Sequence, residues 1–234
     1  AAAAAAVTCV RAQSYRRASE GIDAVPLEKG RLEVRAVDVT GDGWRDLVSV
    51  GDHGSPRINS PQHGVATYVN GGAARAWRVS QQHEFGYGGV DVGDINNDGA
   101  LDACWGVHHP CATYARPKCE RGGATVGYTL IDCALGDGSG VAWRRWHASD
   151  VDSGLLDDGW GMFSTRLGDF DGDGRLDLAS QSFGSGTGFH AYANNGDGTW
   201  RRTHSLPSAN SNSSPMRVGD HNNDGYADVC MPYT

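Results

Sequence analysis

A nine-residue acidic loop occurs four times in this chain of 234 residues. Each copy has an oxygen-bearing side chain at positions 1, 3, 5 and 9 and a glycine at position 6. Together with the backbone carbonyl of position 7, such a loop can supply the six or more hard oxygen ligands that Ca2+ prefers. Softer metals would require His or Cys at these positions. The copies are Asp38–Asp46, Asp94–Asp102, Asp169–Asp177 and Asp220–Asp228.

The glycine at position 6 fits the same interpretation. The chain must turn sharply around an ion there, and a positive φ is costly for a residue with a Cβ atom. Short strings rich in Asp and Asn also form ordinary Asx turns without a metal, so one copy alone would be a weak signal. Four copies with the same internal spacing favour calcium loops over solvated acidic turns. The glycines are Gly43, Gly99, Gly174 and Gly225.

The residues that follow each loop exclude an EF-hand. An EF-hand loop has twelve residues, closes with Glu and lies between amphipathic helices. Here each loop closes with Asp and leads into a short apolar stretch, which predicts a strand rather than a helix. The predicted strands include residues 47–50, 103–105, 178–180 and 229–231.

A second repeated element, a turn of small residues followed by a tryptophan, occurs after each of the first three loops. It predicts a hairpin turn and a further strand. A large aromatic side chain at a repeated position usually fills a repeated gap between sheets. We therefore interpret these tryptophans as packing residues rather than as a ligand platform. They are Trp77, Trp143 and Trp200.

The spacing of the loops sets the size of the repeat. Successive loops begin 56, 75 and 51 residues apart, which is enough chain for one four-stranded unit each. Such periods are typical of a propeller or of another repeat array. Gly accounts for 34 of the 234 residues, about twice the usual share, and helical periodicity is hard to find. We predict one all-β domain.

The loop motif, the strand that follows it and the Gly-Asp-Gly hairpin before a tryptophan resemble the FG-GAP/VCBS repeat family of calcium-binding β-propellers, which includes the integrin α headpiece. The resemblance covers roughly residues 34–234 and implies a β-propeller of four-stranded blades, with about four blades visible and about four Ca2+ ions. It implies these side-chain ligands: Asp38, Thr40, Asp42 and Asp46; Asp94, Asn96, Asp98 and Asp102; Asp169, Asp171, Asp173 and Asp177; Asp220, Asn222, Asp224 and Asp228. The position-7 carbonyls belong to Trp44, Ala100, Arg175 and Tyr226.

Two loops depart from the others in charge. Thr40 offers a neutral hydroxyl where Asp or Asn is usual, so we expect the first site to bind calcium most weakly. The third loop carries four carboxylates, and we expect it to bind calcium most tightly.

The number of blades stays open at this stage. Propellers of this family usually have more blades than the four motifs predict. The fourth motif has few residues after it, so the sequence that follows does not complete its blade. Either residues 1–33 supply the missing strands and close the ring, or the chain is a fragment of a larger propeller. We therefore divide the chain into an N-terminal segment, residues 1–33, and the repeats, residues 34–234.

The charge of the chain is explained by its loops. The formal net charge is -8, and 13 of the 28 acidic residues lie in the four loops. Four Ca2+ ions would therefore leave the protein near neutral. The acidity indicates metal sites rather than a basic partner, and we expect no nucleic-acid partner. No apolar stretch approaches the ~20 residues of a membrane-spanning helix, so we expect no membrane insertion.

Six cysteines, together with loops that would stay largely empty at cytosolic calcium levels, favour an extracellular location, secreted or at the cell surface. One predicted pair brackets a short insertion, and a second joins adjacent strands of the second unit. The third joins the equivalent position of the fourth unit to the N-terminal segment, which would close the ring. A zinc site is the competing interpretation, but the cysteine spacing fits no common one. The predicted pairs are Cys111–Cys119, Cys104–Cys133 and Cys9–Cys230.

Three functions stay open because propellers host unrelated functions. The first is a calcium-stabilised module for interaction, adhesion or assembly, with a protein or glycan partner at the propeller loops or a place in a larger extracellular complex. The second is a carbohydrate-binding propeller that uses exposed Trp or Tyr with Asp or Asn between blades. The third is an enzyme such as a polysaccharide lyase or hydrolase, with His109 and Asp157 as the residues to test. No catalytic motif supports the third, and we expect no enzymatic activity.

Overall fold

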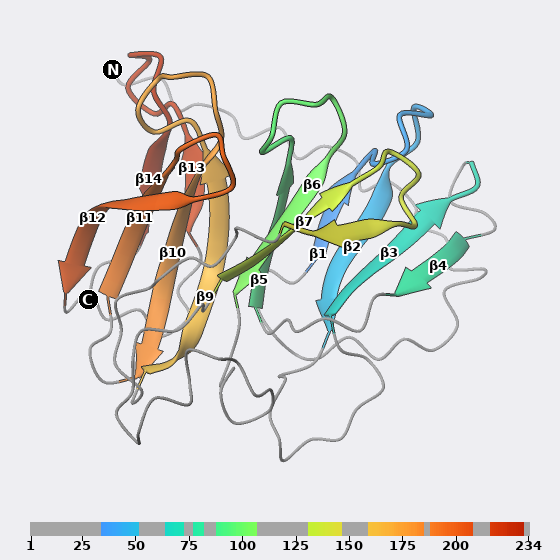
Figure 1. Cartoon of the computed structure of the whole chain (residues 1–234), viewed down its shortest axis with the longest axis horizontal. Coiled ribbons are helices and arrows are strands. Elements are labelled where there is room, and N and C mark those ends of the chain that lie inside the picture. The colour runs from blue at the N-terminus through green and yellow to red at the C-terminus, as the bar shows by residue number, and fades with distance from the viewer. Residues whose placement is uncertain are drawn as a thin grey trace, which may run out of the picture.

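The computed structural model describes residues 34–51, 64–72, 77–81, 88–106, 131–146, 159–184, 188–207 and 216–231. Every regular element in these ranges is a β-strand (Figure 1). Within the same ranges there is no helix with the length and apolarity that spanning a bilayer requires. The predicted all-β class is confirmed.

Three antiparallel sheets have four strands each, and these strands pair in the order in which they follow along the chain. The first sheet contains β1 (Val34–Val37), β2 (Asp46–Gly51), β3 (Gly64–Asn70) and β4 (Trp77–Gln81). The second contains β5 (Gly88–Gly93), β6 (Asp102–Gly106), β7 (Ile131–Gly136) and β8 (Trp143–Arg145). The third contains β9 (Gly159–Gly168), β10 (Asp177–Gly184), β11 (Gly188–Asn194) and β12 (Trp200–Pro207). A two-stranded sheet follows, with β13 (Arg217–Gly219) and β14 (Asp228–Cys230).

The predicted strands fall where the repeats placed them. Strands β2, β6, β10 and β14 each begin at the last Asp of an acidic loop, and β4, β8 and β12 each begin at a repeated tryptophan. Each four-stranded sheet therefore has an acidic loop between its first two strands and a short hairpin between its last two. The fourth unit shows only its first two strands among the described residues. The proposed ring closure by residues 1–33 stays a prediction, because that segment lies outside them.

The first strand of each sheet lies next to the first strand of the following sheet. Strand β1 contacts β5, β5 contacts β9, and β9 contacts β13. Figure 1 shows the three four-stranded sheets side by side, with the inner strands β5 and β9 next to each other and β4 and β12 at the far sides. Sheets that meet through their first strands and point their last strands outward are arranged as propeller blades.

The apolar core lies between successive sheets, in three clusters. Val48, Val65 and Trp105 belong to the cluster between the first and second sheets. The other clusters lie between the second and third sheets, and between the third sheet and β13–β14. In the described part of the chain, each four-stranded blade therefore buries apolar side chains against the blade that follows it.

Two of the three tryptophans at the repeated position, Trp143 and Trp200, pack between blades, as predicted. Trp143 is 6% exposed, and its indole Nε1 donates a hydrogen bond to Thr67 Oγ1 in the neighbouring sheet at 2.8 Å. Trp200 packs against the cluster between the second and third sheets, where its ring meets Trp146 edge to face at 5.8 Å between centroids. An edge-to-face pair of this kind adds to the stabilisation from burial alone.

A disulfide bond joins Cys104 on β6 to Cys133 on β7, and both residues are fully buried. The two residues are direct partners in the antiparallel register. This predicted pair is confirmed. Cys230 is exposed and has no disulfide partner among the described residues. The other predicted pairs, Cys9–Cys230 and Cys111–Cys119, involve residues outside the described ranges.

A buried histidine on β11 makes the stability of the third blade depend on pH. His190 is 5% exposed, its Nδ1 lies 2.9 Å from Ser205 Oγ, and burial with the nearby charge of Arg202 lowers its pKa from 6.5 to about 4. Below pH 6.5 the unfolded chain therefore takes up a proton that the folded chain refuses. This contribution to stability is complete above pH 6.5 and is lost as the pH falls toward 4.

We expect His190→Gln to reduce the loss of stability between pH 7 and pH 5, because glutamine does not titrate there. The measurement is urea unfolding at both pH values in saturating calcium. His204→Gln on the neighbouring strand is the matched control, because His204 is exposed. If both variants keep the full pH dependence of the unmodified protein, His190 is not the group responsible.

Candidate metal centres

The four acidic loops occupy equivalent places in the fold. Each joins the first strand of its sheet to the second, at the same end of the strands that pack side by side. We call them loops 1 to 4, in chain order: residues 38–46, 94–102, 169–177 and 220–228.

The position-1 aspartate of every loop holds the loop's own backbone. Its Oδ2 accepts a hydrogen bond from the amide of the position-6 glycine at 2.8, 2.8, 3.0 and 2.9 Å in loops 1 to 4. Its Oδ1 accepts a second bond from the amide at position 4 or 5. In loop 4, the Gly225 amide and other loop amides lower the pKa of Asp220, so this carboxylate stays ionised.

The predicted positive φ at position 6 is confirmed in every loop. Gly43, Gly99, Gly174 and Gly225 have φ values of 88°, 89°, 84° and 92°. A Cβ atom at any of these residues would have no neighbour within 4 Å. Glycine is therefore required by the backbone conformation alone and not by crowding.

The position-5 aspartates also cap the turn. Their Oδ1 atoms accept hydrogen bonds from the position-7 amides at 2.8, 2.8, 2.9 and 3.0 Å in loops 1 to 4. In loops 2 and 4, the position-3 side chains of Asn96 and Asn222 donate to the second carboxylate oxygen at 2.9 Å. The loops are thus shaped by Asx turns, in which the position-5 carboxylates hold the backbone at position 7.

The position-9 aspartates are buried at the base of the first three loops. Asp46, Asp102 and Asp177 are 0%, 0% and 1% exposed. In each, Oδ2 accepts from the position-2 amide at 2.8 to 3.0 Å, and Oδ1 accepts from an amide at the end of the third strand at 2.8 to 2.9 Å. In loop 4, Asp228 makes the position-2 contact at 2.9 Å. One carboxylate therefore fixes a loop to two strands of its own blade.

Burial makes the negative charge of two of these carboxylates costly. Burial, with the charges of Asp98 and Asp94 added, raises the pKa of Asp102 to about 6. Burial likewise raises the pKa of Asp177. A cation next to such a carboxylate would offset this cost, because an opposite charge favours the ionised form.

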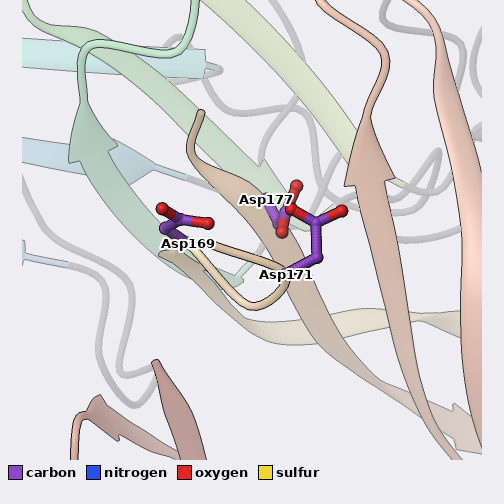
Figure 2. A group of neighbouring side chains, drawn as sticks. All are labelled: Asp169, Asp171 and Asp177. Carbon is purple, nitrogen blue, oxygen red and sulfur yellow. The ribbon is translucent and has the colours of Figure 1, made fainter. Parts of the chain in front are cut away.

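Loop 3 brings three carboxylates together. One oxygen from each of Asp169, Asp171 and Asp177 lies within 4.8 Å of the other two (Figure 2). Among the four loops, only loop 3 has aspartate at positions 1, 3 and 9. The other loops therefore cannot form this triad. The fourth carboxylate, Asp173, instead accepts a hydrogen bond from Arg175 Nη2. An oxygen-only triad of this size could bind a hard divalent cation.

Loop 1 has a hydroxyl in place of the position-3 carboxylate. Thr40 Oγ1 lies 3.4 Å from Asp38 Oδ1 and 3.5 Å from Asp46 Oδ2. The hydroxyl therefore stands between the carboxylates of positions 1 and 9. The expected order of affinity, with loop 1 weakest and loop 3 tightest, stays a prediction.

The repeats match a family model described as FG-GAP-like repeat over residues 38–105 and 181–231, slightly more than half of the chain. The chain belongs to the FG-GAP repeat family. No curated protein sequence matches the chain. The two matched segments contain loops 1, 2 and 4 of this FG-GAP protein. Loop 3 lies outside them, yet it makes the same hydrogen bonds as the other loops.

Position 4 of the FG-GAP loop requires a positive φ, which the sequence analysis missed. Gly41, Asn97, Gly172 and Asn223 have φ values of 71°, 59°, 78° and 61°. Asn tolerates this left-handed region better than other residues with a Cβ atom. The restriction of position 4 to Gly and Asn in all four copies is the signal that could have revealed it.

The role of position 2 was also missed: in loops 1 to 3 its residue packs against the blade that follows. Val39 and Ile95 are 4% and 0% exposed, Phe170 is partly buried, and His221 is exposed. A side-chain amide of the third blade, Asn194 Nδ2, donates to the Ile95 carbonyl at 2.8 Å. The position-2 residue is buried where a four-stranded blade follows its loop. It is only partly buried where β13 and β14 follow.

Loops 3 and 4 touch each other directly. The amide of Ala227 donates to the carbonyl of Asp169 at 2.8 Å. The ring of Tyr226 lies on Gly172, where an added Cβ would come within 2.5 Å of Tyr226 Cε1. Trp44 and Tyr226 at position 7 are 48% and 47% exposed. Ligation through the position-7 carbonyls of Trp44, Ala100, Arg175 and Tyr226 stays a prediction.

Other candidate residues of the sequence analysis lie outside the described ranges. They include the residues proposed for an enzymatic function, His109 and Asp157.

Proposed function

We propose that this FG-GAP propeller is a calcium-stabilised extracellular module for interaction, adhesion or assembly. The observation that supports this most directly is the double attachment of loops 1 to 3. Position 9 holds the loop to the third strand of its own blade, as Asp102 does at Gly136 N (2.9 Å). Position 2 packs against the following blade, as Ile95 does under Asn194. A cation in the loop would stabilise both contacts.

The donor set of the loops fits calcium. The side chains at positions 1, 3, 5 and 9 offer only oxygen, which is the ligand type of hard cations. In loop 3, Asp169, Asp171 and Asp177 would hold the ion. The equivalent positions would hold it in the other loops, giving about four Ca2+ ions per chain.

When bound, calcium would supply positive charge to carboxylates that burial and mutual repulsion destabilise. A site with a Kd about a hundredfold below the ambient calcium concentration stabilises the folded state by about 2.7 kcal/mol. Extracellular calcium could saturate such sites. The buried Cys104–Cys133 disulfide supports the same location, because disulfides persist in oxidising compartments.

We expect removal of calcium by a chelator to lower the melting temperature by about 5–10 °C for each well-occupied site. The measurement is thermal unfolding in millimolar calcium and again in excess chelator. Magnesium at the same concentration is the control, because its small octahedral shell fits a loop with many carboxylate ligands less well. An unchanged melting temperature, or equal stabilisation by both ions, would contradict the calcium assignment.

A second candidate function, carbohydrate binding, is favoured by one cleft. A cleft of about 420 Å3 lies between the third sheet and β13–β14. It combines apolar surface from Phe170 and Phe189 with polar groups of Thr203, His204 and Asp228. Sugars bind to such surfaces through stacking on an aromatic ring and hydrogen bonds from their hydroxyls. Asp171 of loop 3 also lines the cleft, so calcium could influence this site.

For this second function, we expect signals on a glycan array that disappear in His204→Ala while the melting temperature stays unchanged. His204 is exposed, so its replacement costs little stability. Arg201→Ala is the control, because Arg201 is an exposed residue of the same strand outside the cleft. No array signal in calcium, or signals that survive in His204→Ala, would count against carbohydrate binding at this cleft.

An enzymatic function is a separate hypothesis that rests on His109 and Asp157. Turnover of a polysaccharide that Asp157→Asn abolishes without loss of folding would support it. Intact turnover in both Asp157→Asn and His109→Ala would remove these residues from consideration.

A further inference from the structure

Four charged residues occupy one repeat position on the inner strands. Each lies three residues before the first aspartate of a loop: Arg35 on β1, Asp91 on β5, Arg166 on β9 and Arg217 on β13. Because these first strands pack side by side around the propeller axis, equivalent residues on them come close together.

The carboxylate of this group is already engaged. Arg35 Nε lies 2.7 Å from Asp91 Oδ1, with the two side chains 29% and 16% exposed. The amide of Leu167 on β9 donates to Asp91 Oδ2 at 2.9 Å. Asp91 therefore links the first three blades, and both of its oxygens have partners.

Arg166 forms no ion pair of this kind with the described residues. Arg166 is buried and only 2% exposed. Arg166 Nε donates to the Met216 carbonyl at 3.4 Å, and Nη1 donates to the Thr165 carbonyl. The same Met216 carbonyl accepts from Arg217 Nη1 at 3.0 Å. Arg166 Nη2 is buried and has no hydrogen-bond partner among the described residues.

The group carries an excess of positive charge. The charges of Arg35, Asp91 and Arg217 all act on Arg166. Three guanidinium groups thus accompany one carboxylate, so two positive charges, those of buried Arg166 and exposed Arg217, have no partner within the group. Burial and the charges of Arg35 and Arg217 lower the pKa of Arg166 to about 10, although Asp91 opposes this. Neutral carbonyls satisfy hydrogen bonds but do not compensate a buried charge, and an uncompensated buried charge is costly.

We propose that the propeller axis binds a divalent oxyanion of the sulfate type at Arg166 and Arg217. Two charges on the ligand match the excess of two on the protein. The planar fork of guanidinium donors suits the oxygens of such an anion, and the free Nη2 of Arg166 supplies an unused donor. This site is separate from the acidic loops, which would bind cations.

The test is isothermal titration with sodium sulfate in calcium-containing buffer at constant ionic strength. We expect saturable sulfate binding that acetate and chloride do not reproduce. Arg217→Gln should weaken it about tenfold or more, because it removes one charge-assisted contact. Arg201→Gln is the matched control, since it removes the same charge from an exposed outer strand, and it should leave the sulfate affinity unchanged.

A second variant changes the charge of the group without replacing either arginine of the proposed site. Asp91→Asn retains an oxygen for the Leu167 amide and removes the competing carboxylate. We expect it to bind sulfate severalfold more tightly. The proposal is overturned by no saturable heat with sulfate, by equal affinity for acetate, by an unchanged affinity in Arg217→Gln, or by weaker binding in Asp91→Asn.

Discussion

Replacing Asp177 by asparagine is expected to destabilise the calcium-loaded protein by about 2–4 kcal/mol. Asp177 is 1% exposed and accepts hydrogen bonds from Phe170 N at 3.0 Å and Asn194 N at 2.8 Å. Asparagine has nearly the same shape, but its side-chain NH2 group replaces one of the two carboxylate oxygens. That group is a donor and would face a backbone N–H, so one hydrogen bond is lost. It also removes a carboxylate from the triad of loop 3. The measurement is urea unfolding in saturating calcium.

Unfolding the same variant in chelator separates two contributions to the loss of stability, that of the metal and that of the hydrogen bonds. Burial raises the pKa of Asp177, so in metal-free protein at neutral pH its charge is a burden that asparagine removes. The loss should therefore be clearly smaller in chelator than in calcium. Asp197→Asn in the hairpin between β11 and β12 is the control, because Asp197 is exposed and lies outside the four acidic loops. An equal loss for Asp177→Asn in both conditions would mean that this residue acts without a metal.

Replacing Gly89 by alanine is expected to cost about 4 kcal/mol or more, or to prevent folding. Gly89 on β5 has a φ of +67°, and a Cβ there would lie 2.4 Å from Ser164 N and 2.5 Å from Thr165 N on β9. These are backbone atoms of the neighbouring inner strand, so no side chain can move aside. The two strands would have to separate at the propeller axis.

Gly138→Ala measures how much of this effect is backbone strain alone. Gly138 has a φ of +76°, but an added Cβ would have no neighbour within 4 Å. Its replacement should cost only about 1–2 kcal/mol, the penalty for a left-handed conformation. Urea unfolding of both variants gives the comparison. Similar losses would contradict the close approach of β5 and β9, and with it the arrangement of the sheets as adjacent blades.

The strands and loops could be predicted because they depend on local signals. The acidic motif, the position-6 glycine and the repeated tryptophan each recur at fixed places in the repeat, and the strands begin at them. The Cys104–Cys133 bond followed from the expectation that the two residues lie on neighbouring strands, which the register of β6 and β7 bears out.

The contacts between blades could not be predicted in the same way, because they depend on how the sheets pack. Gly89 stands outside every repeated motif, and its need for glycine arises only where β9 crosses it. The repeat position of Arg166 and Arg217 is visible in the sequence. Their convergence at the axis depends on which face of each inner strand points to its neighbour.

The most direct test of the calcium assignment is native mass spectrometry of metal-stripped protein titrated with Ca2+, beside four variants with asparagine at position 1 of one loop. These are Asp38→Asn, Asp94→Asn, Asp169→Asn and Asp220→Asn. If the loops are calcium sites, the unmodified protein will bind about four ions and each variant about one fewer. No bound calcium, or the same number of ions in every variant, would contradict this account and leave the loops as acidic turns held by their own hydrogen bonds.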